Sequence, residues 1–164
     1  MKKLFCFASA LLILTACQQK QYFTSSPEID LVKKANEAYF KGDWETLKSV
    51  FADKAKAWFN TSRWKDMALT PDQLIDSFKA GVTNYSEYKM DENPVYEMIV
   101  YDGAKWVHCW YTWSGKTKNG KEVSVPAHLS SLVKDNKIVL HFIIVNALPG
   151  YLAMQPSDST KVTR

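Results

Sequence analysis

Three histidines are the side chains of this chain best suited to acid–base or metal chemistry. His108, His128 and His141 fall on three successive segments in which polar and apolar residues alternate, as on strands whose side chains point to opposite faces in turn. On neighbouring antiparallel strands the three imidazoles can converge, and imidazole nitrogens are common zinc ligands. The spacing matches no local metal-binding signature. Each histidine can thus be a structural residue, a polar group in a pocket or a metal ligand; we expect no metal and no other cofactor.

Large aromatic side chains cluster on the segments around these histidines. Aromatic residues make up 13% of the chain, which has six tryptophans. Residues 105–114 carry Trp106 and Trp110 on one face, and Tyr111 and Trp113 on the other. Both faces need cover, so the pattern predicts an aromatic-lined pocket, a surface that pairs with a second copy of the chain, or both. A charge at Tyr111 or Trp113 is expected to weaken such a dimer.

The sequence contains no glycine-rich phosphate loop, no nucleophile elbow and no cysteine pair. The formal net charge is only +4, and lysines and arginines are interspersed with acidic residues. This distribution lacks the basic patch with which proteins bind nucleic acids. We therefore expect no nucleic-acid partner.

The N-terminal residues predict where the protein works. Lys2 and Lys3 precede an apolar run from Leu4 to Leu14, and small residues come just before Cys17, which is the pattern of a secretory signal peptide. The run is shorter than the ~20 residues needed to cross a membrane. The end of this leader, Leu-Thr-Ala-Cys, resembles the lipobox of bacterial lipoproteins, whose cysteine takes a diacylglycerol. We expect residues 1–16 to be removed and the mature protein to be anchored in the bacterial cell envelope by lipid on Cys17.

The remaining 148 residues, 17–164, are enough for one domain. Without Lys2 and Lys3 the formal charge falls from +4 to +2. Cys109 is the one cysteine left once Cys6 leaves with the leader and Cys17 carries lipid, so it is expected to be a buried, inert thiol. Residues 17–26 are polar and without periodicity, which predicts a tether. Residues 27–148 form the predicted domain, and residues 149–164 a C-terminal tail.

Capping residues and apolar periodicity predict three helices in the first half of the domain. Ser26 and Pro27 begin the first and Gly42 ends it, Asp43 caps the second, and Thr70 with Gln73 forms a capping box for the third. The predicted strands span residues 55–59, 85–90, 95–101, 105–114, 122–133 and 138–145. Helices followed by a meander of long strands predict an α+β fold.

Two motifs at the right separation resemble a known superfamily. Gly42-Asp43, followed by Leu47, Phe51-Ala52-Asp53 and Ala57, is similar to the helix-to-strand passage of the nuclear transport factor 2-like superfamily, which includes SnoaL-like polyketide cyclases and ketosteroid isomerases. Residues 134–142, Lys-Asp-Asn-Lys-Ile-Val-Leu-His-Phe, resemble its last hairpin. The resemblance covers about residues 27–146. It implies a cone-shaped, curved antiparallel sheet with three N-terminal helices packed on its concave face, a pocket at the wide end, and commonly a homodimer.

The resemblance also locates the positions where isomerases carry their catalytic residues. Counted without gaps from Gly42-Asp43, the base aspartate falls at Phe59 and the oxyanion tyrosine at Ala35. The second oxyanion acid falls near His128 or Leu129. Isomerisation needs both a base and a donor to the enolate, so this chain lacks the isomerase machinery.

We therefore expect a lipid-anchored SnoaL-like domain that binds a small apolar molecule or acts as an interaction module. The alternative is a SnoaL-like isomerase, cyclase or hydrolase that uses His128 or His141. A third possibility is a structural envelope protein whose own side chains fill the cavity. The residues expected to contact a ligand are Tyr39, Trp58, Asn60, Tyr85, Trp106, Trp110, His128 and His141.

The lipobox generates a direct prediction. Cys17→Ser removes the acceptor thiol, so the variant should lose lipid labelling and leave the membrane fraction, because no other segment of the sequence can hold it there. Metabolic labelling with a fatty acid and cell fractionation measure both effects. Retention of the variant in the membrane fraction would contradict the lipoprotein interpretation.

Overall fold

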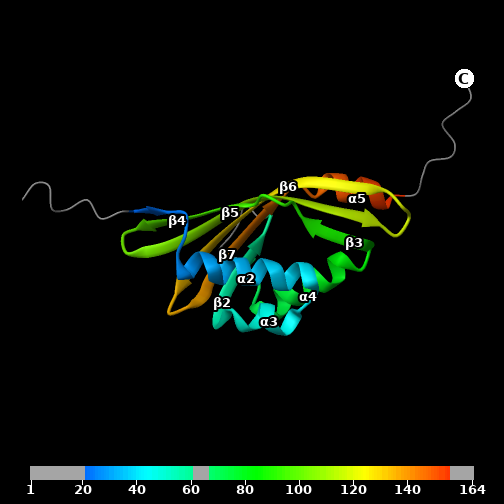
Figure 1. Ribbon diagram of the computed structural model, residues 1–164. Helices are drawn as coiled ribbons and strands as arrows, with labels where there is room; N and C mark the ends of the chain where they lie inside the picture. Colours follow the sequence, from blue (N-terminus) through cyan, green and yellow to red (C-terminus); the bar gives the residue numbers. More distant parts are fainter. Residues whose placement is uncertain (1–20, 61–66, 156–164) are drawn as a thin grey trace, which may run out of the picture.

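The computed structural model describes residues 21–60 and 67–155, which form a curved sheet with helices against it (Figure 1). The predicted leader and Cys17 lie outside the described residues. In chain order the elements are β1 (Tyr22–Phe23), α2 (Pro27–Lys41), α3 (Trp44–Ser49), β2 (Phe51–Phe59), α4 (Pro71–Val82), β3 (Tyr85–Met90), β4 (Val95–Tyr101), β5 (Ala104–Thr117), β6 (Glu122–Lys134), β7 (Lys137–Val145) and α5 (Leu148–Met154).

The helices begin where the capping residues predict, and α2 ends at the predicted glycine, whereas α4 continues one residue past Gly81 to Val82. The Ser26 hydroxyl accepts a hydrogen bond from the Ile29 amide at the start of α2. Gly42 ends α2 in the left-handed conformation, with φ of 68°, which glycine adopts without strain. At α4, Thr70 and Gln73 exchange both bonds of the capping box. The three predicted N-terminal helices are confirmed.

The seven strands form one open sheet in the order β1-β4-β5-β6-β7-β2, and β3 shares an edge of β5 with β4. Strands β5 and β6 make the longest antiparallel pair, from Lys105 opposite Val133 to Lys116 opposite Glu122. The expected antiparallel meander is confirmed, with one difference: β2 runs parallel to β7. No tight turn joins these two strands, so chain connectivity does not impose an antiparallel pair.

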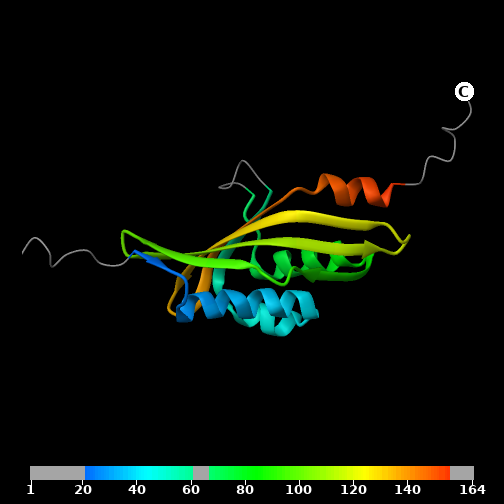
Figure 2. The ribbon, with the colours of Figure 1, turned by 45° about the horizontal axis from the view of Figure 1, so that its top comes forward.

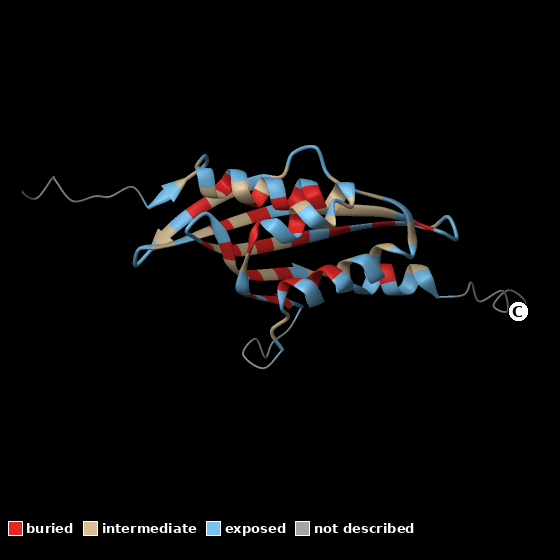
Figure 3. Cartoon of the chain, turned by 90° about the horizontal axis from the view of Figure 1, so that it is seen from below, coloured by how far each residue is buried: buried red, intermediate tan, exposed pale blue. Residues whose placement is uncertain are grey.

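Helices α2, α3 and α4 pack on the concave face of the sheet, as expected (Figures 1 and 2). Ile29 and Val32 of α2 and Leu74 of α4 are fully buried there and belong to the same apolar cluster as Val107 and Cys109 of β5. Figure 3 shows the buried residues concentrated between the helices and the sheet. Cys109 is fully buried, as expected of an inert thiol, and burial raises its pKa to about 11.

The structured region extends beyond the predicted domain at both ends. Tyr22 and Phe23 pair with Ile99 and Met98 of β4, so part of the predicted tether is a strand. The predicted tail begins with helix α5, which starts at Leu148. Both corrections have one cause: these short segments are ordered by long-range hydrogen bonds that leave no local pattern in the sequence. No helix in residues 21–60 or 67–155 is long and apolar enough to cross a membrane.

Candidate functional site

A cavity of about 390 Å³ lies between the concave face of the sheet and helices α2, α4 and α5. Ligand sites in proteins commonly occupy ~300–1,000 Å³. Most of the residues that line this cavity are apolar or aromatic, and no Asp, Glu, Lys or Arg is among the described ones. The cavity is therefore large enough for a small molecule and offers it an uncharged surface.

Odd-numbered residues of β5 and β6 form the sheet wall of the cavity. Tyr111 and Trp113 come from β5, and Val125, Ala127 and Leu129 from β6. Successive side chains of a strand point to opposite faces, so this register directs every even-numbered residue outward.

Gly115 leaves room for the aromatic part of this wall. A Cβ atom on Gly115 would lie 2.5 Å from the Trp113 ring and 2.9 Å from the Tyr85 ring. These two rings pack edge to face, with centroids 4.9 Å apart. The absence of a side chain at residue 115 therefore lets both rings lie across the strand at the edge of the cavity.

His141 is the only described histidine that borders the cavity, and it is 5% exposed. Its Nδ1 lies 2.8 Å from the Oγ atom of fully buried Ser131, and its ring packs edge-on against Phe51. Burial lowers the pKa of His141 to about 4, so the ring is neutral at pH 7. Since Nδ1 is engaged by Ser131, Nε2 is the nitrogen left for a ligand. A neutral imidazole donates or accepts there according to its tautomer.

Other polar groups at the cavity are hydrogen-bond donors rather than bases. Burial raises the pKa of Tyr39 to about 12 and raises that of Tyr111 further above its ordinary value, so both hydroxyls are protonated at neutral pH. Asn36 is 7% exposed, and its Nδ2 donates to the Tyr96 hydroxyl at 2.8 Å. The side chains that line the cavity thus offer polar contacts without a carboxylate.

The structure brings together only part of the expected ligand-contacting set. Tyr39, Tyr85 and His141 line the cavity. Trp58, Trp106, Trp110 and His128 do not: they lie on the outer, convex face, because the register pairs Trp110 with His128 and Trp58 with Phe142. This corrects their expected position at the cavity.

Asn60 has a structural task at the end of β2. Its Nδ2 donates to the Val145 carbonyl at 2.6 Å, and its Oδ1 accepts from the Val145 amide at 2.8 Å. The side chain thus continues the pairing of β2 with β7 beyond the strand. Its amide is committed to the backbone, which corrects its expected ligand contact.

The three histidines do not converge. His108 and His128 meet on the outer face, where Nδ1 of His108 lies 3.3 Å from Nε2 of His128 in nearly parallel rings. The Trp110 ring stacks on His128 with centroids 4.7 Å apart. His141 points to the opposite face. Among the described residues, no three histidine, cysteine or acidic side chains are placed to hold a metal ion.

Two of the positions that the resemblance assigns to isomerase catalytic residues, Phe59 and Ala35, line the cavity. For the third position, Leu129 lines the cavity, whereas the alternative His128 lies on the outer face. None of the three side chains at the cavity can move a proton or stabilise an oxyanion. The sequence analysis did not predict that Trp113, Tyr111 and α5 line the cavity. Strand alternation placed Trp113 and Tyr111 on one face of β5 correctly, but no local pattern indicated which face the helices cover.

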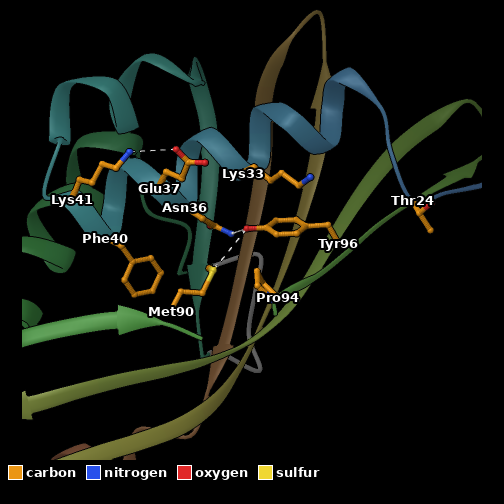
Figure 4. A pocket seen from close by; sticks show the side chains of 9 residues that line it. All are labelled: Thr24, Lys33, Asn36, Glu37, Phe40, Lys41, Met90, Pro94 and Tyr96. Atoms are coloured by element: carbon orange, nitrogen blue, oxygen red, sulfur yellow. Dashed lines mark hydrogen bonds and ion pairs between the residues drawn. The ribbon is translucent and has the colours of Figure 1, made fainter. Parts of the chain in front are cut away.

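A second hollow of about 610 Å³, the outer groove, lies on the other side of α2 (Figure 4). Asn36 borders both hollows, and its hydrogen bond to Tyr96 stands between them. Lys33 lies over the Tyr96 ring, 5.4 Å from its centroid, and Lys41 pairs with Glu37 at 3.4 Å. The outer groove is thus lined partly by charged residues, unlike the cavity.

Solved structures with the same arrangement confirm the expected fold. A proposed polyketide cyclase from Xanthomonas campestris pv. campestris has a TM-score of 0.61 at 17% identity, covering 77% of this chain and 95% of that one. A proposed SnoaL-like polyketide cyclase from Shewanella putrefaciens has a TM-score of 0.57 at 18% identity, covering 80% and 99%. An NTF2-like protein from Burkholderia xenovorans has a TM-score of 0.60 at 14% identity, covering 81% and 100%.

No family model and no curated protein sequence matches the chain. The shared architecture nevertheless shows that this chain has the cone-shaped fold of nuclear transport factor 2-like and SnoaL-like proteins. At identities below one fifth, the likeness defines the fold and leaves the activity to be argued from the site.

The buried imidazole generates a pH prediction. Folding lowers the pKa of His141 from about 6.5 to about 4. Between these two pH values the histidine is therefore protonated in the unfolded chain and neutral in the folded chain. The His141 contribution to stability is complete above pH 6.5 and is lost as the pH falls to 4, about 3 kcal/mol in all.

His141→Gln, whose amide can still reach Ser131, should remove that part of the pH dependence. Urea unfolding of both proteins between pH 7 and pH 4 measures it. His108→Gln is the comparison: burial lowers the pKa of half-buried His108 as well, so this variant should remove a smaller part of the pH dependence. Parallel stability curves for the wild type and His141→Gln would contradict a buried neutral ring.

Proposed function

We propose that this domain binds a small, uncharged, largely apolar molecule in the cavity, with a polar atom of the ligand hydrogen-bonded to Nε2 of His141. One observation carries the proposal: a cavity of about 390 Å³ with apolar and aromatic walls contains a single neutral imidazole with one unused nitrogen. Burial of the ligand would supply affinity, at ~25 cal/mol per Å² of apolar surface, and the imidazole would supply orientation.

The uncharged lining supports a neutral ligand. An ion that enters an apolar cavity loses its hydration and needs a counter-charge there, and no charged side chain is among the described residues that line this one. A flat aromatic or polycyclic molecule with one carbonyl or hydroxyl group fits these walls better than an acid or an amine.

Catalysis of SnoaL-like type is the second candidate. It is supported by the structural neighbours that are themselves proposed polyketide cyclases and by the position of His141 in the cavity. Against it, the isomerase positions are apolar, and a ring whose pKa is about 4 is a weak base. An enzyme on this scaffold would therefore act through His141, and not through His128 on the outer face.

Lipid on Cys17 would hold this site at a membrane. Four residues, 18–21, separate Cys17 from strand β1. At no more than ~3.6 Å per residue, Cys17 and Tyr22 lie within ~18 Å of each other. The proposed role is thus that of a ligand-binding domain carried close to the bilayer surface of the cell envelope.

We also propose a homodimer through the outer face of the sheet. Tyr111 and Trp113 line the cavity on the inner face, so the proposed interface does not include them, in contrast to the contact expected from the sequence. The outer face instead exposes Trp110 and Ile144, at 41% and 60%, together with Val95 and Ile99 of β4. Exposed apolar surface of this extent commonly marks a protein contact.

Ligand binding should be visible in tryptophan fluorescence. Trp113 is the one tryptophan among the described residues that line the cavity, so a neutral aromatic ligand should quench its emission. Trp113→Phe should abolish most of the quenching, whereas Trp106→Phe on the outer face should leave it. A titration with neutral polycyclic ketones, analysed by chromatography for products, separates binding from turnover. Turnover that disappears in His141→Ala would replace the binding proposal with the enzyme.

The dimer has a separate test. Trp110→Asp places a charge in the proposed interface and should convert the protein to a monomer, whereas Ser124→Asp, at an exposed polar position farther along the same face, is the matched control. Light scattering at increasing protein concentration measures the mass. A monomeric wild-type protein at the highest concentration would contradict the proposal.

A further inference from the structure

Helix α5 is apolar both where it borders the cavity and where it faces solvent. Gly150, Tyr151 and Met154 line the cavity. Leu148, Tyr151 and Leu152 are 57%, 59% and 56% exposed, and the helix contains no charged residue. Leu148 and Leu152 do not line the cavity. Closure of the cavity therefore does not explain why apolar side chains occupy these two exposed positions.

The body of the protein holds α5 mainly through its backbone. Asn119 Nδ2 donates to the Ala153 carbonyl and Lys121 Nζ to the Gln155 carbonyl, each at 3.1 Å. Gly150 packs so closely that a Cβ atom there would lie 2.8 Å from the Tyr85 hydroxyl oxygen. These contacts fix α5 beside the turn between β5 and β6 (Figures 1 and 2) and leave its leucines free for another partner.

The size of the surface argues against a second copy of the chain as that partner. A seven-residue helix is ~10 Å long, whereas a stable protein interface buries ~800 Å² on each side. The sequence that follows α5, Ser157-Asp158-Ser159-Thr160-Lys161, is polar. Insertion into a lipid surface needs only a few apolar side chains, buried ~5–10 Å among the headgroups.

The charges around α5 fit a lipid surface. Lys118 and Lys121 belong to the turn that holds the helix. Lys116 stands opposite Glu87 on β3 and Glu122 on β6, so these two glutamates and the three lysines at this end of the sheet leave a net positive charge of one. Two lysines next to an uncharged apolar helix form the combination that binds anionic membrane surfaces.

We propose that α5 inserts Leu148 and Leu152 into a phospholipid surface and so brings the cavity wall that it forms against the bilayer. This inference rests on the proposed function and specifies it further: the ligand is an uncharged molecule that partitions into membranes and passes between the bilayer and the cavity beside α5. The contact is independent of the lipid on Cys17. With only two leucines inserted it is weak and reversible, so it does not retain the protein in the membrane fraction during cell fractionation and leaves the outcome expected of Cys17→Ser unchanged.

Flotation of unlipidated protein with vesicles tests the contact. Residues 17–164 with Cys17→Ser contain every element of the described fold and carry neither leader nor lipid. This protein should float with vesicles of phosphatidylcholine and phosphatidylglycerol, and less with phosphatidylcholine alone. The double variant Leu148→Asp, Leu152→Asp should lower the partition coefficient at least about tenfold, because one buried leucine side chain contributes about that factor.

Tyr101→Asp is the control, since Tyr101 is a large side chain, 76% exposed at the end of β4 and not among the residues of the proposed dimer interface; it should retain vesicle binding. Circular dichroism verifies that all variants fold. Absence of flotation with either vesicle, an equal loss in Tyr101→Asp, or loss of a dimer in the α5 variant would each overturn the proposal.

Ligand quenching of Trp113 without vesicles distinguishes the ligand site from the membrane contact of α5. Quenching without vesicle binding would refute only the α5 contact. Vesicle binding without quenching would refute the proposed ligand function and leave α5 as a membrane contact alone.

Discussion

The alternation of side chains along β5 and β6 is the constraint on which the rest of the structure depends. These two strands pair over twelve residues, from Lys105 to Lys116, and every residue on them is assigned to one face by its parity. A slip of one residue would exchange the cavity wall with the outer surface. Val107, Cys109, Tyr111 and Trp113 lie on the inner face, which the helices cover. The outer face receives Trp110 and the histidine pair.

The uncharged cavity follows from how that inner face is covered. Helices α2 and α4 seal it with apolar side chains, so the one imidazole inside is isolated from water and from any carboxylate. Burial therefore keeps His141 neutral, and Ser131 occupies one of its nitrogens. At the positions that the resemblance assigns to the isomerase base and to the oxyanion tyrosine, this chain has Phe59 and Ala35. The binding that we propose for the cavity therefore rests on burial and a single hydrogen bond.

Strand β1 and helix α5, the first and last elements of the described fold, lie at opposite ends of the sheet. Strand β1 pairs with β4 beside residues 106 and 107 of β5, whereas α5 lies next to the turn that follows residue 117. About ten residues of extended strand, at ~3.3 Å each, separate these places along the sheet. A lipid on Cys17 and an inserted α5 would therefore touch one bilayer only if the long axis of the sheet lay along it. In that orientation the cavity wall formed by α5 is close to the lipid.

The sequence by itself determined the elements, because their signals are local. Caps at Ser26, Thr70 and Gly42 set the helix ends, and strand periodicity located β3 and β4 at their observed limits. It also placed Trp113 and Trp110 on opposite faces of one strand. Only the tertiary structure decided which face the helices cover, and so placed Trp113 inside and Trp58, Trp106, Trp110 and His128 outside. The parallel pairing of β2 with β7, strand β1 and helix α5 likewise depend on contacts between distant residues, which periodicity within a segment does not encode.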